Sequence, residues 1–88
     1  MKKLIVIAAS LMVSATAMAG PKCTDGNKES WIPEAKFQQD LQEQGYKIKK
    51  FKTTSGGCYE IYGHNAQDQK VEIYFNPING DIVKQEID

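Results

Sequence analysis

The sequence has few of the residue types that build catalytic or metal sites. Its 88 residues include one histidine, His64, two cysteines, Cys23 and Cys58, and no arginine. No HxxxH, HExxH or CxxCH spacing occurs, which excludes these short zinc and haem motifs. With a single imidazole, no serine can be placed beside a base. The sequence therefore predicts no catalytic residues, no metal site and no cofactor, and we expect that the protein is not an enzyme.

Basic charge is scarce as well. If residues 1–19 are removed, nine lysines remain against eleven acidic residues, a formal charge of −2. A nucleic-acid partner would require a clustered basic surface, so the balance argues against nucleic-acid binding. Four lysines do gather within 47–52. We interpret them as a charged edge strand, where lysine discourages pairing between sheets; a basic patch for an anionic partner is the alternative.

The first long apolar run lies at the beginning of the chain. Leu4–Val13 follows two lysines, and Ala17-Met18-Ala19 supplies the small residues of a signal peptidase site. The run is too short for a membrane-spanning helix, which needs about 20 apolar residues. We therefore expect residues 1–19 to be a signal peptide. The mature protein would be periplasmic, with no membrane insertion after cleavage.

The remaining 69 residues suffice for one domain. We divide them into an irregular arm, 20–29, and a domain, 30–88. In an oxidising compartment, two cysteines in so small a domain predict one disulfide, Cys23–Cys58. A redox or metal pair is the alternative, but no CxxC and no Cys-His cluster supports it.

One helix is predicted over Ser30–Gln44. Pro33 would stand in its first turn, where the missing N–H costs little, and Gly45 suits the residue after its end. Phe37 and Leu41 are four residues apart and so share one face. We expect that face to pack on a sheet; a partner-binding amphipathic helix is the alternative.

Period-two alternation broken by turn residues predicts an antiparallel meander. Two runs, Tyr59–Tyr62 and Val71–Phe75, form a central hairpin, and Ile82-Val83 follows the turn at 76–80. A further strand, Tyr46–Lys52, needs a β-bulge near Lys49-Lys50 to bring its aromatic residue onto the core face. The predicted fold class is α+β, with one helix on one face of an antiparallel sheet.

Alternation assigns the side chains of the hairpin to two faces. One helix covers one face only, so we expect the other face to be solvated, and its carboxylates to lack the desolvation that would tune an acid. A tyrosine pair there forms a platform of the kind found at binding hot spots, or simply stabilises the hairpin. The predicted core residues under the helix are Tyr59, Ile61, Val71, Ile73 and Phe75. The candidate partner-binding residues on the other face are Glu60, Tyr62, His64, Glu72 and Tyr74.

The chain resembles the PepSY domain in its small exported form. The resemblance rests on Trp31, Ala35 and Leu41, on Gly45–Ile48 and Gly57–Tyr62, and on Val71–Pro77 and Asn79–Val83. It implies a helix packed on an antiparallel sheet. Such domains occur in propeptides of secreted thermolysin-like metallopeptidases and are thought to inhibit or regulate peptidases.

The function we infer from this resemblance is a periplasmic, non-enzymatic module that binds a protein partner, which it inhibits or regulates if that partner is a peptidase. Two alternatives remain open. One is an accessory subunit of a membrane redox, cytochrome or sensor system. The other is a small-ligand-binding module that uses the tyrosine face.

Overall fold

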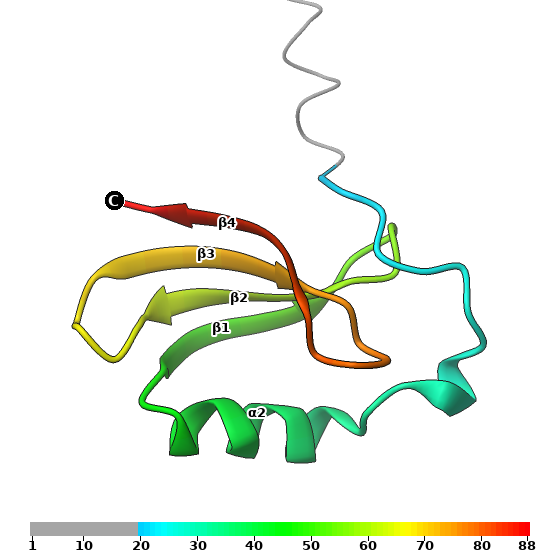
Figure 1. The fold of residues 1–88 in the computed structure, drawn as a ribbon, viewed down its shortest axis with the longest axis horizontal. Coiled ribbons are helices and arrows are strands. Elements are labelled where there is room, and N and C mark those ends of the chain that lie inside the picture. Colours follow the sequence, from blue (N-terminus) through cyan, green and yellow to red (C-terminus); the bar gives the residue numbers. More distant parts are fainter. Residues whose placement is uncertain (1–19) are drawn as a thin grey trace, which may run out of the picture.

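A computed structural model describes residues 20–88; the expected signal peptide, 1–19, lies outside the described residues. Four strands form one antiparallel sheet in the order β1-β2-β3-β4, and the helix α2 lies along one face of it (Figure 1). The predicted α+β fold is confirmed. The elements are η2 (Lys28–Ser30, a 3₁₀ turn), α2 (Glu34–Glu43), β1 (Lys47–Thr53), β2 (Tyr59–His64), β3 (Lys70–Phe75) and β4 (Ile82–Ile87).

The helix begins later than the sequence predicts. Pro33 is its N-cap residue and has an extended backbone, with ψ at 139°, so α2 begins at Glu34 and not at Ser30. The backbone N–H of Ile32 donates instead to the carbonyl of Pro77, at 2.8 Å. This contact ties the chain before the helix to the β3–β4 turn. At the other end Gly45 has a φ of +104°, as expected of the residue that follows a helix.

The predicted bulge in the first strand is present. The pairing of β1 with β2 shifts between Ile48 and Lys50, and Phe51 then stands opposite Ile61 on the core side. Gly63 lies opposite Ile48 at this irregularity. A Cβ atom on Gly63 would overlap the carbonyl oxygen of Lys47, so this close approach of β1 and β2 requires glycine.

The core lies between α2 and the sheet. All five predicted sheet residues are buried, together with Phe37 and Leu41 from the helix. The ring of Phe37 is edge-on to two of them, with centroid distances of 5.0 Å to Tyr59 and 5.1 Å to Phe75. The Tyr59 hydroxyl donates to the carbonyl of Ile32 at 2.7 Å. Full burial of each such side chain contributes about 1.5–3 kcal/mol, so the helix is held mainly by this aromatic packing.

The arm that precedes η2 is attached to the end of the sheet (Figure 1). The predicted disulfide joins Cys23 to the fully buried Cys58. The backbone N–H of Cys23 donates to the carbonyl of Gly56 at 2.9 Å, and the side-chain amide of Asn76 donates to the carbonyl of Cys23 at 3.3 Å. The arm is therefore bound to the β1–β2 loop and to the end of β3.

Candidate functional site

The sheet face opposite α2, which we call the open face, carries two rows of polar side chains. Register places one residue from each strand in each row, because all four strands pair with their neighbours in the chain. Tyrosine and glutamate alternate on the two central strands, so each tyrosine stands opposite a glutamate. The first row is Lys52, Glu60, Tyr74 and Lys84, and the second is Lys50, Tyr62, Glu72 and Glu86.

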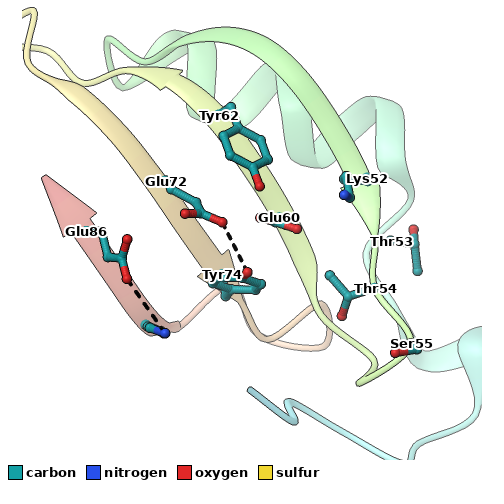
Figure 2. A pocket seen from close by; sticks show the side chains of 10 residues that line it. Lys52, Thr53, Thr54, Ser55, Glu60, Tyr62, Glu72, Tyr74 and Glu86 are labelled. Carbon is teal, nitrogen blue, oxygen red and sulfur yellow. Dashed lines mark hydrogen bonds and ion pairs between the residues drawn. The ribbon is translucent and has the colours of Figure 1, made fainter. Parts of the chain in front are cut away.

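A depression of about 510 Å³ lies on this face. Figure 2 shows the carboxyl groups of Glu60 and Glu72 between the two tyrosine rings. All four strands contribute to it, as does the loop that follows β1. Its lining residues are Lys52, Thr53, Thr54, Ser55, Glu60, Tyr62, Glu72, Tyr74, Lys84 and Glu86.

Glu60 is buried, which contradicts the prediction of a uniformly solvated face. Its residue exposure is 2%, and its Oε2 atom has no hydrogen-bond partner within residues 20–88. Burial raises the pKa of the Glu60 carboxyl above its ordinary value, and the neighbouring Glu72 raises it further. The expectation that carboxylates here lack desolvation is therefore wrong for Glu60. This residue lies on an inner strand, with Lys52 and Tyr74 as its neighbours on either side.

The two central carboxyl groups have opposite proton preferences. The hydrogen bond with Glu60 lowers the pKa of Glu72, whose Oε2 also accepts a hydrogen bond from the Tyr74 hydroxyl at 3.1 Å. Of the two carboxyl groups, Glu60 therefore binds a proton more readily than Glu72 does. Such a pair can accept or release one proton and can bind a cation.

Both tyrosines of the open face stay protonated. The neighbouring Glu60 and then Glu72 raise the pKa of Tyr62, while burial is the main reason that the pKa of Tyr74 is raised. The two residues are diagonal neighbours, since Tyr62 pairs with Glu72 and Tyr74 pairs with Glu60. Tyr62 is 36% exposed and offers its ring to a partner. The centre of the face thus combines two neutral hydroxyl groups, two rings and two carboxyl groups.

His64 does not join this group. It stands at the far end of β2, opposite Lys70, and does not line the depression. The structure therefore brings together four of the five predicted residues of the face. Whether those four bind a partner remains a prediction.

Comparison with known protein families identifies the family of this chain. Residues 3–86 match the family described as the peptidase propeptide and YPEB domain, which is nearly the whole chain. This protein belongs to the PepSY family. Comparisons with curated proteins and with solved structures found no match. The family is associated with the propeptides of peptidases and with their inhibition, and its domains are typically non-catalytic propeptide or regulatory modules.

Sequence reasoning missed part of the depression in this PepSY domain. Lys84 and Glu86 line it from β4, which the sequence analysis recognised only at Ile82-Val83. Alternation puts Lys84 and Glu86 on one face of β4, but the shift in pairing between Tyr74 and Phe75 decides that this is the open face, beside Tyr74 and Glu72. The hydroxyl groups of Thr53, at the end of β1, and of Thr54 and Ser55, in the loop that follows, gave no signal in the sequence.

The described part of this PepSY domain offers little other chemistry. Residues 20–88 hold no group of three histidine, cysteine or acidic side chains that could bind a metal ion, and both cysteines are in the disulfide. In the same residues no helix is both long enough and apolar enough to cross a membrane. The open-face depression is thus the site with the most concentrated polar chemistry.

Proposed function

We propose that this PepSY protein is a non-enzymatic binding module, and that it recognises a peptidase through its open face. Membership of a family of peptidase propeptides supports the class of partner. The depression between Tyr62 and Tyr74 supports the place of contact, because tyrosine side chains are enriched at interface hot spots. The proposed role is to inhibit or regulate the peptidase.

The observation that carries this proposal is the centre of the open face, which no helix covers within the described residues. Helix α2 lies over the opposite face (Figure 1), and within residues 20–88 no helix lies over the open face. An antiparallel sheet can present one face to water, but the residues displayed there are then usually polar throughout. Here two aromatic rings and a buried carboxyl group occupy its middle.

We also propose that the protein acts outside the cytoplasm, in the periplasm, after removal of residues 1–19. The disulfide supports this location, because such bonds persist in oxidising compartments. The sequence pattern of residues 1–19 supports export by a signal peptide.

The test is photo-crosslinking in cells, combined with substitution of the tyrosines. A photoreactive phenylalanine analogue at position 62 should form a covalent adduct with a peptidase, and the same analogue at Gln39, on the exposed side of α2, should not. For the captured peptidase, Tyr62→Ala combined with Tyr74→Ala should weaken binding by more than about 2 kcal/mol.

The fold should survive these substitutions, because neither ring belongs to the core. A matched control, Gln39→Ala with Glu43→Ala on α2, should leave binding unchanged. Adducts from position 39 alone would assign binding to α2 and refute the proposal that the partner binds the open face. Adducts from position 62 with proteins that are not peptidases would refute the proposed partner class.

A further inference from the structure

We propose that the open-face depression is an arginine-binding site, in which the carboxyl groups of Glu60 and Glu72 take the guanidinium group of a partner's arginine side chain. This inference deepens the proposed function, which supplies only the source of the arginine. The site itself can be tested with a small probe and without any partner protein.

The first observation is the buried oxygen of Glu60. This residue is 2% exposed and lines the depression, yet its Oε2 atom has no hydrogen-bond partner within residues 20–88. Buried polar atoms in proteins nearly always have a partner, and an exception calls for an explanation. When one carboxyl group is protonated, the hydrogen bond between Glu60 and Glu72 engages Glu60. When both are charged, neither can donate, and a donor from another molecule that enters the depression would provide the partner.

The second observation is that the protein's own cations do not fill this role. Lys52 pairs with Glu60 in the strand register, and Lys84 lies at the other end of the same row. Within residues 20–88, neither lysine forms an ion pair with Glu60, and Lys84 instead contacts Glu86 at 3.7 Å. The whole sequence contains no arginine. A guanidinium group at this site must therefore come from another molecule.

The geometry favours arginine over lysine. Glu60 and Glu72 are diagonal neighbours on adjacent strands, so two carboxyl groups lie side by side rather than at one point. A guanidinium group is planar and presents several N–H donors in a fork, whereas an ammonium group is a compact point charge. The rings of Tyr62 and Tyr74 flank the carboxyl groups (Figure 2), and the exposed ring of Tyr62 offers a face on which a guanidinium plane can stack.

Binding of a cation should shift the proton equilibrium of Glu60. In the free protein, burial and the neighbouring Glu72 raise the pKa of Glu60, so this residue binds a proton more readily than Glu72 does. An incoming cation favours the carboxylate form, so Glu60 should lose its proton at a lower pH when the guanidinium group is bound. The other charged or titratable groups that line the depression are Lys52, Tyr62, Glu72, Tyr74, Lys84 and Glu86. Among these, Tyr62 has its pKa raised mainly by Glu60 and Tyr74 has its pKa raised mainly by burial, so both tyrosines stay protonated.

The experiment titrates the protein with N-acetyl-arginine amide and follows the amide signals by NMR. We expect saturable shifts at Glu60, Tyr62 and Tyr74. N-acetyl-citrulline amide, which has nearly the same shape but no charge, should cause none, and N-acetyl-lysine amide should bind more weakly. Glu60→Gln should weaken arginine binding about tenfold or more, because it removes a charge-assisted hydrogen bond. Titration calorimetry in buffers of different ionisation enthalpy should detect proton release in the pH range in which Glu60 titrates in the free protein.

Glu29→Gln is the matched control, since it removes the same charge from an exposed residue outside the depression. An equal loss of binding in Glu29→Gln and Glu60→Gln would refute the site and indicate only a general charge effect. Equal binding of the citrulline and arginine probes would refute guanidinium recognition. If Glu60→Gln loses its native spectrum, Glu72→Gln takes its place with the same expected loss. If the arginine probe shifts no amide signals but crosslinking from position 62 succeeds, the arginine site is refuted and the proposed function stands.

Discussion

Reduction of the Cys23–Cys58 disulfide should remove a large part of the stability of this domain. The bond closes a loop with a sequence separation of 35 residues. Constraint of the unfolded chain by a loop of that length contributes about 4 kcal/mol at 25 °C in the chain-entropy account. The free energy of unfolding of a domain as long as residues 20–88 is roughly 3–10 kcal/mol in total.

Urea unfolding with and without a reductant measures this contribution while every other atom stays in place. We expect the reduced protein to lose about 4 kcal/mol, and its melting temperature to fall by about 15–30 °C. Substitution of either cysteine lowers the stability further, because it also removes packing contacts of the side chain. Cys58 is fully buried and Cys23 is not, so Cys58→Ala should cost slightly more than Cys23→Ala through lost packing, within a total of about 2–5 kcal/mol.

Two results would refute this reasoning. One is a melting temperature that does not respond to reductant. The other is alkylation of two free thiols in the native, oxidised protein. If instead Cys58→Ala is far more harmful than reduction, packing of the sulfur atom and not loop closure is the main contribution.

Two further predictions concern Glu60 and the beginning of the chain. Because the pKa of Glu60 is raised in the folded state, its contribution to stability is fully present below the unfolded value, about 4.3, and is lost as the pH rises through the folded value. The side chain of Glu60→Gln cannot ionise, so in urea unfolding this variant should be as stable as the wild type at about pH 4 and more stable at about pH 8. Glu29→Gln is the control. A Glu60→Gln variant that is less stable than the wild type at the higher pH would contradict the raised pKa of Glu60. Intact-mass measurement of the exported protein should find a chain that begins at Gly20, and a species that retains Met1 or carries a lipid on Cys23 would overturn the expected processing.

Alternation was enough to separate the two faces of β2 and β3. Successive side chains in a strand point to opposite sides whatever packs against them, so Ile61 and Ile73 could be assigned to the core and Tyr62 and Tyr74 to the open face. The bulge in β1 could be predicted for a similar reason, because Phe51 is out of phase with Ile48. These features depend on local geometry alone.

The helix start and the burial of Glu60 depend on contacts distant in sequence. Pro33 fits both the first turn of a helix and the position before it, and the bond from Ile32 to Pro77 decides between them. The exposure of Glu60 depends on neighbours from both adjacent strands, Lys52 and Tyr74. Register across two β-bulges determines which residues of β1 and β4 complete each row, and no local pattern contains that information.

The strand order has a consequence for how the chain assembles. Each strand pairs with the next one in the sequence, so the loops that close as the sheet forms are short and their entropic cost is small. The arm is different, because its contacts with the loop after β1 and with Asn76 span 33 to 53 residues. The sheet can therefore form before the arm attaches. In the reduced protein of the first experiment, residues 20–27 should detach from the sheet while the pairing of β2 with β3 persists.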